Sequence, residues 1–384
     1  MPRYPDFVPH IDALPGATYS RLAHTLAAHE GEVYPLHIGD TWMDPAVGCR
    51  MQDLNVDDHP GLHRYSSTRG HPALVSALVA REKRNTGLDT TASEVLPVAG
   101  ATAGLTALMA TLVSPGDEVI LLAPYWPLMS NAVRAMGGVP VPVPFIDVAH
   151  DAKSAVAVVE AHRTERTVAI YWNTPNNPTG RVIPADWLAA LAQWAEGHGL
   201  WIVADEVYEH YTYTGTPHAY SRALAPALTI SAHSFSKAYG MAGNRCGYLA
   251  GPAAVMDAVH KVTRCTVYSV PTAAQLAAAK ALAGPGDAWA AAAATKYAAA
   301  GQAAAERLGL PPPEGSTFLF FDLAEHLDGR GLAGFLEDCA HDGLLVAPGS
   351  SFGPYPTHVR VCFTAVEPAV TARGIEILAK RLGR

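Results

Sequence analysis

The stretch LTISAHSFSKAYGMAGNR, residues 228–245, joins an apolar run to a segment of small and hydroxyl-bearing residues. The run 228–233 is nearly apolar throughout, which is typical of a strand buried on both faces of a sheet. Lys237 follows among hydroxyls and glycines, and Arg245 comes eight positions later. Hydroxyls and an arginine suit a phosphate, and a partly desolvated lysine can act as an amine nucleophile. This stretch predicts a site where a phosphorylated ligand meets a reactive amine.

Nearly apolar, strand-like runs similar to 228–233 recur along the chain from Glu94 onward. Helical stretches such as 102–112 and 184–198 lie between them, so the alternation predicts βαβ units and an α/β fold with a mainly parallel sheet. The other runs are EVLPVAG (94–100), EVILLAPYW (118–126), TVAIYWN (167–173) and LWIVADE (200–206).

The C-terminal third predicts a smaller α/β domain. An alanine-rich helix over 273–308, broken near 284–286, precedes a strand at 318–322, a helix from about 332 to 341, the strand-like THVRVCFT and a terminal helix. We therefore expect three parts: a segment 1–40 that packs with the small domain, a large cofactor-binding domain 41–283, and the small domain 284–384.

Composition narrows the class of protein. The 384 residues are too many for one ordinary core, and 49% of them are hydrophobic. A net charge of −8 without a basic run argues against nucleic acid or a membrane surface as a partner. The five cysteines form no CxxC pair, so we expect neither a metal site nor disulfides. No signal peptide or membrane-spanning run is apparent, which predicts a soluble cytoplasmic protein.

Polar residues follow three other runs, where ligands collect in sheets of this kind. Gly100-Ala101-Thr102 opens a predicted helix and could present backbone N–H groups to an anion, or form only a helix cap. The segment 173–180, NTPNNPTG, is a rigid polar turn or only a loop. Asp205 ends a buried strand, where a carboxylate needs a partner such as a helix cap or a protonated ring nitrogen. With Lys237, these features suggest a pyridoxal phosphate Schiff base.

Taken together in their order along the chain, the four segments at 100–102, 173–180, Asp205 and 234–245 resemble those of the fold-type I pyridoxal phosphate enzymes. The resemblance is specifically to the class I/II aminotransferases of the aspartate aminotransferase superfamily. The resemblance runs from Gly39 in LHIGD to Arg360 in HVRVCFT. It implies a large domain with a mainly parallel sheet of the seven-stranded type between helices, and a smaller α/β domain built from both termini. It also implies a homodimer with shared active sites.

The resemblance implies a role for each matching residue. Lys237 matches the Schiff-base lysine and proton shuttle, Asp205 the partner of the pyridinium nitrogen, and Asn177 and Tyr208 the pair at the phenolic oxygen. The remaining matches are the phosphate cup (Ala101, Thr102, Ser234, Ser236, Arg245), the ring-stacking Trp126, the neighbour-reaching Tyr65, and the substrate-carboxylate residues Gly39 and Arg360, with Asn177 beside them.

Two departures from the family's sequence pattern affect which substrate is expected. Gly39 is followed by Asp-Thr-Trp, which puts the indole of Trp42 near the substrate entrance. Aspartate-specific relatives carry an arginine where this chain has Cys265; Arg264 is next to it, and a one-residue shift turns a side chain away. A dicarboxylic substrate is thus in doubt unless Arg264 or Arg69 substitutes. Three tyrosines are further candidates for the pocket wall: Tyr19, Tyr211 and Tyr213. Ordinary packing is the simpler role for each of them.

Transamination between an L-amino acid and a 2-oxo acid is the expected activity. A lyase, cyclase or oxidase on the same scaffold is the alternative, because each begins with the same Cα deprotonation. A cofactor-binding regulator without enzyme activity is a second alternative. Such a protein would typically carry a DNA-binding domain or lack the lysine, and this sequence shows neither feature. A nicotinamide enzyme is disfavoured because no GxGxxG follows the first strand. The sequence does not identify the amino acid.

Overall fold

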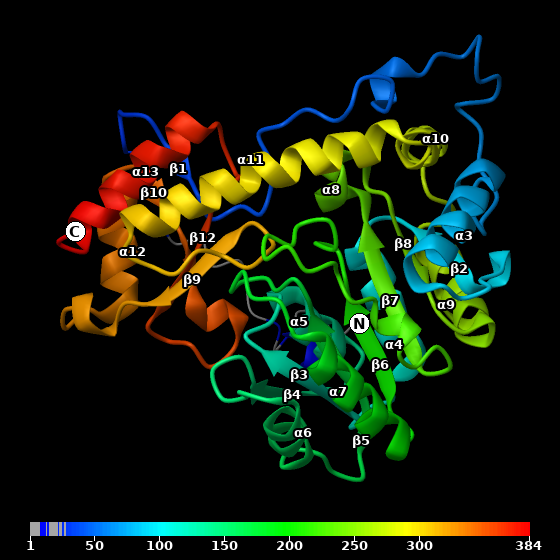
Figure 1. The fold of residues 1–384 in the computed structure, drawn as a ribbon, viewed down its shortest axis with the longest axis horizontal. Helices are drawn as coiled ribbons and strands as arrows, with labels where there is room; N and C mark the ends of the chain where they lie inside the picture. The colour runs from blue at the N-terminus through cyan, green and yellow to red at the C-terminus, as the bar shows by residue number, and fades with distance from the viewer. Residues whose placement is uncertain (1–7, 13, 15–21, 23–24, 27) are drawn as a thin grey trace, which may run out of the picture.

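A seven-stranded sheet forms the centre of the larger part of the molecule (Figure 1). The computed structural model describes residues 8–12, 14, 22, 25–26 and 28–384. Four neighbouring strand pairs are parallel, and only β8 runs antiparallel to its two neighbours. The strands, in their order across the sheet, are β2 (Val95–Val98), β8 (Gly247–Ala250), β7 (Thr229–Ser234), β6 (Trp201–Asp205), β5 (Thr167–Asn173), β3 (Glu118–Ala123) and β4 (Val139–Pro144).

Helices cover both faces of this sheet, which is why its strands are apolar throughout. Along β5, Ala169 and Tyr171 pack into one core cluster, whereas Ile170 and Trp172 pack into another. This alternation follows from the two-residue period of a strand. The first cluster includes α4 (Ala101–Leu112), α5 (Pro127–Ala135) and α9 (Ala253–Thr266), and the second includes α6 (Ala152–Glu160) and α7 (Ala185–Gly197).

The edge strand β4 has the sequence VPVPVP, which the sequence analysis did not identify as a strand. It pairs only with β3, and the backbone N–H of Val139 donates toward the β3 side. Because successive residues of a strand point in opposite directions, Pro140, Pro142 and Pro144 fall on the outer side, where no N–H is needed. The alternating prolines therefore suit an edge and exclude pairing beyond it.

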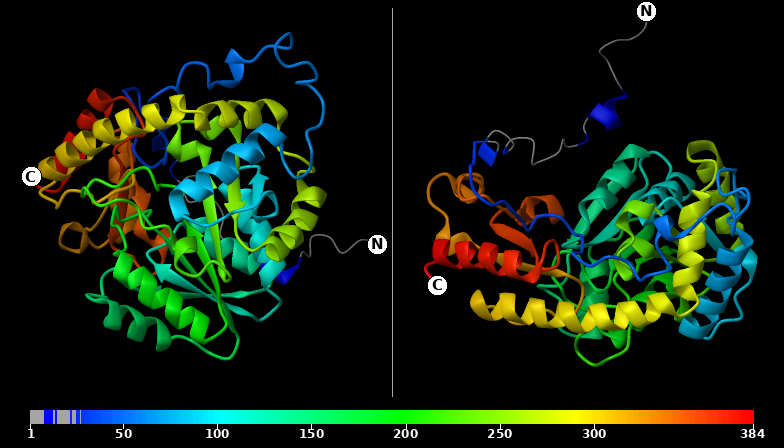
Figure 2. Two further views of the ribbon diagram at one scale, coloured as in Figure 1. Left: turned by 45° about the vertical axis from the view of Figure 1, so that its right-hand side comes forward. Right: turned by 90° about the horizontal axis from the view of Figure 1, so that it is seen from above.

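A second, smaller sheet lies beside the large one (Figure 2). Its antiparallel order is β11 (Ala347–Pro348), β12 (His358–Cys362) and β9 (Phe318–Asp322), with α12 (Gly331–His341) and α13 (Pro368–Arg381) packed on it. The N-terminal segment joins this part, because β1 (Tyr34–Pro35) pairs in parallel with β10 (Leu344–Leu345). Chain ends far apart in sequence thus meet in one layer.

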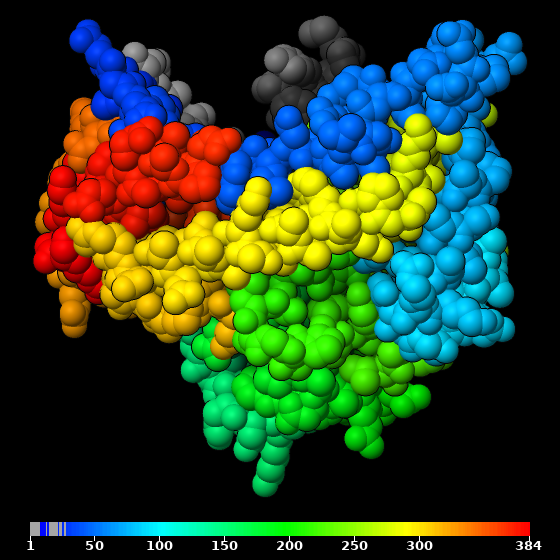
Figure 3. Space-filling view, turned by 45° about the horizontal axis from the view of Figure 1, so that its top comes forward, coloured from blue at the N-terminus to red at the C-terminus, as the bar shows by residue number. Residues whose placement is uncertain are grey.

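The predicted alanine-rich helix is present in two pieces. Helix α10 (Thr272–Leu282) ends before Gly284, and α11 (Pro285–Arg307) begins with a proline in its first turn, where no N–H partner is required. Helix α11 runs across the molecule from α10 to α13 (Figures 1 and 3). Within the described residues, the remaining α-helices are α1 (Pro9–Asp12), α3 (Pro72–Thr86) and α8 (Phe235–Ala238). None of the described helices combines the length and apolar character needed to cross a membrane.

Candidate active site

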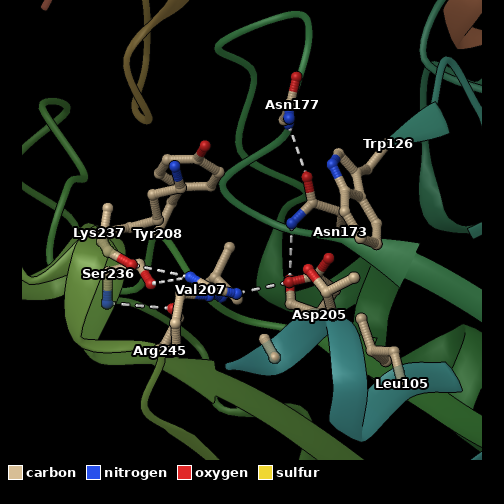
Figure 4. A pocket seen from close by; sticks show the side chains of 14 residues that line it. Leu105, Trp126, Asn173, Asn177, Asp205, Val207, Tyr208, Ser236, Lys237 and Arg245 are labelled. Carbon is tan, nitrogen blue, oxygen red and sulfur yellow. Dashed lines mark hydrogen bonds between the residues drawn. The ribbon is translucent and has the colours of Figure 1, made fainter. Parts of the chain in front are cut away.

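The carboxyl ends of the sheet strands open into a cavity of about 160 Å³. Its walls come from the start of α4, the start of α5, the loop after β5, the end of β6 and the segment around α8. In the view of Figure 4, Lys237 and Ser236 lie on one side, and Trp126 and Asn173 on the other. The sequence-predicted residues that line this cavity are Ala101, Thr102, Trp126, Asn177, Asp205, Tyr208, Ser234, Ser236, Lys237 and Arg245.

Asp205 ends β6 with its side chain buried. One carboxylate oxygen accepts a hydrogen bond from the Tyr171 hydroxyl at 2.8 Å, and the other accepts from the Val207 backbone N–H at 3.4 Å. No lysine or arginine of the described residues forms an ion pair with it. Burial raises the pKa of Asp205 to about 6, against the lowering effect of these two hydrogen bonds. Among the described residues no cation lies within ion-pair distance of this carboxylate, although the charge of His233 also lowers its pKa from farther away.

Lys237 lies on α8, directly after β7. Its Nζ donates to the backbone carbonyl of Gly39, which brings the N-terminal segment to the cavity wall. Burial lowers the pKa of Lys237, which favours the neutral, nucleophilic amine. The Tyr211 hydroxyl donates to the Lys237 carbonyl at 3.0 Å and thereby fixes the backbone of α8.

An anion-binding cradle forms where α4 begins. Gly100, the N-cap of α4, has φ 82°, and a Cβ built there would lie 2.4 Å from Nη2 of Arg245. A side chain at this position would therefore displace the guanidinium from the helix N-terminus. Ser236 Oγ is 3.5 Å from Nη1 of Arg245, and Ser234 caps α8 by accepting from the Ser236 N–H. Backbone donors, hydroxyls and a guanidinium meet here.

The loop after β5 is organised by Asn173, which the sequence analysis did not single out. Its Oδ1 accepts from the Asn177 N–H at 2.6 Å, and its Nδ2 donates to the Asp205 carbonyl at 2.8 Å. Asn173 thereby links the ends of β5 and β6. The sequence signal that could have identified Asn173 as a site residue is its position at the end of the apolar run 167–173. Tyr208 is buried close by, and burial raises its pKa.

Arg360 reaches the site from β12 of the small sheet. Its Nη1 donates to Oδ1 of Asn177 at 2.8 Å and its Nη2 to the His37 carbonyl at 2.5 Å. The guanidinium lies over the rings of Phe318 and Phe352, at 4.3 and 4.8 Å from their centroids. Stacking and hydrogen bonds together hold the planar fork in one orientation.

Buried charges support β7 from behind the cavity. His233, next to Ser234, is 3.0 Å from a carboxylate oxygen of Glu209, and its ring stacks on that of Tyr248. Burial alone would lower the pKa of His233, but Glu209 and its acidic neighbours raise it to about 9. Arg81 pairs with the same carboxylate oxygen of Glu209, at 3.1 Å. The strand that leads to Lys237 is thus fixed by ionic contacts.

Several sequence-predicted residues lie apart from the central cavity. Trp42 packs edge-on against Tyr297 with ring centroids 5.3 Å apart, and it lines none of the cavities described here. Tyr65 is 84% exposed and packs on Tyr268. Arg69 pairs with Asp257, and Arg264 is exposed on α9. Tyr213 donates to the Ser316 carbonyl, and Tyr19 lies outside the described residues.

This geometry is that of a known family. Residues 34–382 match the model of the aminotransferase class I and II family, and the chain belongs to that family. The chain is therefore a pyridoxal phosphate-dependent aminotransferase.

Individual relatives agree with this assignment. A probable aspartate/prephenate aminotransferase of Thermus aquaticus is 40% identical, over 58% of this chain and only 57% of that protein. The aspartate/prephenate aminotransferase of Thermus thermophilus is 33% identical over 84% of each chain. The structure of a Thermus thermophilus aspartate aminotransferase double mutant superposes with a TM-score of 0.90, at 28% identity, covering 98% of this chain and 99% of that one.

The residues present fit pyridoxal phosphate. The buried Asp205 carboxylate lacks the cation that a protonated ring nitrogen would supply. The absence of a Cβ at Gly100 lets the Arg245 guanidinium lie close to the N-terminus of α4. Its donors suit a phosphate, and Lys237 supplies an amine of lowered pKa.

Proposed function

We propose that Lys237 holds pyridoxal phosphate covalently and that the chain moves an amino group between an L-amino acid and a 2-oxo acid. The observation that carries this assignment is that Lys237, Asp205 and Arg245 line one cavity. An amine, an unpaired carboxylate and an anion cradle in one cavity match the aldehyde, ring nitrogen and phosphate of this cofactor.

Each wall of the cavity takes one part of the cofactor. Asp205 would pair with the ring nitrogen, Asn177 and Tyr208 would contact the phenolic oxygen, and Trp126 would stack on the ring. The phosphate would be held by Ala101, Thr102, Ser234, Ser236 and Arg245. When bound, the cofactor supplies an aldehyde for amines and a ring that withdraws electrons from the substrate Cα.

Arg360 orients the substrate by binding its α-carboxylate with both guanidinium nitrogens, beside the Gly39 backbone. This contact would direct the Cα–H bond toward Lys237, whose Nζ, released when the substrate amine takes its place on the aldehyde, would accept the Cα proton and donate it back. Burial lowers the pKa of this amine, which favours the neutral form that a base requires.

The active unit is a homodimer in which Tyr65 reaches the phosphate of the other subunit. Support comes from the exposed aromatic pair Tyr65 and Tyr268, 84% and 50% exposed, with the half-exposed Val267 beside it. Such a patch on a surface is typical of an interface. A cytoplasmic location is supported by the five cysteines, all of which are free thiols.

Borohydride reduction of the purified coloured enzyme, followed by peptide mapping, tests the assignment. The reduced adduct is expected on Lys237, and Lys237→Ala should bind the cofactor without turnover. An adduct on any other lysine would overturn it.

Substrate chemistry is tested by omitting one partner. An amino acid added alone should convert at most one equivalent of bound cofactor, and a 2-oxo acid should restart turnover in a ping-pong pattern. Continued turnover with release of ammonia would instead indicate a lyase.

A further inference from the structure

A cluster of buried charged side chains lies on the reverse side of the central cavity. In the sequence, Glu206 of this cluster follows Asp205, and His233 precedes Ser234. Asp205 and Ser234 line the cavity, whereas their neighbours belong to the cluster, because successive side chains of extended backbone point in opposite directions. A movement in the cluster therefore moves the backbone that presents the cavity residues. The buried members of the cluster are Arg81, Glu82, Glu206, Glu209, Arg222 and His233.

The arginines of the cluster do not balance its carboxylates. Arg81 lies 3.1 Å from Glu209, and Arg222 lies 3.4 Å from Glu82. Among the described residues, no lysine or arginine lies within ion-pair distance of Glu206, and its Oε2 accepts no hydrogen bond. A buried charge without a partner is costly. One further positive charge is therefore needed at Glu206.

His233 is placed to supply that charge. Its Nδ1 lies 3.0 Å from an oxygen of Glu209, and its Nε2 lies 3.8 Å from Glu82 and 3.8 Å from Glu206. The ring thus contacts all three buried carboxylates. Burial alone would lower the pKa of His233, but these carboxylates raise it to about 9. The ring is therefore an imidazolium at neutral pH.

The other titratable groups around the cluster leave this charge count unchanged. Tyr248 stacks on the ring of His233, and burial raises the pKa of its hydroxyl, which stays neutral. Burial lowers the pKa of His210 to about 4, so its Nε2 is an acceptor for Arg81. Two carboxylates, with side chains 25% and 45% exposed, lie at the edge of the cluster, where water also solvates them. The remaining titratable groups in contact with the cluster, these two included, are Glu94, His218, Tyr220, Tyr239 and Asp287.

We propose that His233 is a positioning residue of the cofactor site and that it acts as an imidazolium, whose charge balances the buried carboxylates and so holds the backbone of Asp205 and Ser234 in the binding geometry. This inference rests on the proposed function, because it takes the central cavity to be the cofactor site. His233 does not line that cavity and acts only through its neighbours. Loss of its proton leaves Glu206 uncompensated, so cofactor affinity falls at alkaline pH.

A steric role is the alternative, because the ring of His233 is packed flat against Tyr248, with ring centroids 4.5 Å apart. That role depends on the shape of the ring and not on the charge of Glu206. Charge balance depends on both residues. Neutralising Glu206 therefore separates the two roles.

Glu206→Gln should change the melting temperature of the cofactor-free protein in opposite directions in two backgrounds. In the wild type it removes a compensated charge and should lower the melting temperature. In His233→Gln it removes the uncompensated charge and should raise it, since removing one partner of a buried ion pair is costly whereas removing both is often tolerated. Calorimetry at pH 8, above the ordinary histidine pKa of about 6.5, measures both. A decrease or no change in His233→Gln, or an increase in the wild type, would overturn the proposal.

His218 supplies the matched control, because it contacts Glu206 at 3.6 Å and no other carboxylate of the described residues within ion-pair distance. In the His218→Gln background, Glu206→Gln should lower the melting temperature, as in the wild type. An increase there would assign the balancing charge to His218 and overturn the role of His233.

Binding of pyridoxine 5'-phosphate links the charge to the site, because this compound has no aldehyde and cannot react with Lys237. At pH 8, His233→Gln should bind it about tenfold more weakly than the wild type, and the double variant with Glu206→Gln should return to within about threefold. Above pH 9 the wild type alone should lose affinity. The ratio of the dissociation constants of wild type and double variant cancels the titration of the ligand itself. A ratio that stays constant from pH 7 to 10 would exclude the positioning role, whether or not His233→Gln folds.

The charge of His233 can be observed directly by nitrogen NMR of the histidine-labelled, cofactor-free protein. The signal of His233 is assigned by its loss in the double variant, and both ring nitrogens should be protonated at pH 8. A neutral ring would refute the inference. The melting and NMR experiments need no cofactor, so they decide the charge of His233 even if borohydride mapping finds no adduct on Lys237 and the proposed function fails.

Discussion

Asp205 carries an electrostatic cost that the fold alone does not relieve. Its carboxylate is buried, and the pKa of about 6 lies well above the ordinary value of 3.8. Because the folded chain binds this proton more tightly than the unfolded chain does, ionisation lowers the free energy of unfolding. The cost is about 3 kcal/mol above pH 6 and disappears as the pH falls toward 4. A functional residue is held here at the expense of stability.

Asp205→Asn should therefore stabilise the cofactor-free enzyme at neutral pH while weakening cofactor binding. The melting temperature of the variant, relative to the wild type, should be higher at pH 7.5, and the difference should shrink toward pH 4. Calorimetry of both cofactor-free proteins between pH 4 and 8 measures this. A difference that does not vary with pH would contradict the role of the buried charge, and unchanged cofactor affinity would contradict the ring-nitrogen pairing.

Arg360→Lys should raise the Michaelis constant for the amino acid at least tenfold and leave the cofactor bound. A single ammonium cannot reproduce a fork that is aligned by Asn177, His37 and two phenylalanine rings. Steady-state kinetics and the spectrum of the bound cofactor report the two effects separately. The control is Arg330→Lys, whose guanidinium binds Asp328 and Asp338 on the surface. If Arg360→Lys behaves like this control, the α-carboxylate binds elsewhere.

At the scale of elements, the start of α4 acts as a ligand site because its N-cap has no side chain. The N–H groups of the first turn are free of helical partners and point toward the cradle. A methyl group at Gly100 would meet the end of Arg245, which is a flexible side chain and would move aside. The main consequence is then a displaced guanidinium and not a disrupted core.

Gly100→Ala should weaken cofactor binding at least tenfold. Gly116→Ala is the matched control, since its φ of 90° resembles the 82° of Gly100 but no atom lies within 4 Å of its added Cβ. Both variants should lose about 1–2 kcal/mol of stability, because alanine disfavours positive φ. Cofactor titration followed by absorbance separates them: equal affinity in the two variants would show that Arg245 does not hold the phosphate.

At the scale of the whole molecule, the site needs the large sheet, the small sheet and the N-terminal segment together. Asp205 and Lys237 come from the large sheet, Arg360 from β12, and the Gly39 carbonyl from the segment that pairs at β1. The exposed Tyr65 does not line the central cavity of its own chain, and its role in the partner's site is part of the proposed dimer.

Mixing two inactive variants tests the shared site. Tyr65→Ala and Lys237→Ala dimers, dissociated and reassociated together, should form hybrids in which one of the two sites keeps both residues. About a quarter of all sites should then be intact, because pairing of the two chains is random. Each variant treated alone is the control. No recovery, or full activity of an obligate monomer, would exclude the exchange of Tyr65.

The sequence by itself determined the sheet and most of the central cavity. Apolar runs buried on both faces are a local property, and so are the polar residues that end or follow them, such as Asp205 and Asn177. Since parallel strands end at one edge, these residues had to meet there. The strand β4 was missed because its prolines argue against a strand until its place at the edge is known.

Only the tertiary structure decided what surrounds that cavity. Arg264 and Arg69 were candidates for a second carboxylate, but one is exposed and the other is paired with Asp257. Glu82, in a helix that the sequence analysis did not single out, meets His233 behind the cavity. Which face of α3 contacts the buried charges depends on how this helix packs against the large sheet. That packing joins residues far apart in the chain, so local sequence carries no record of it.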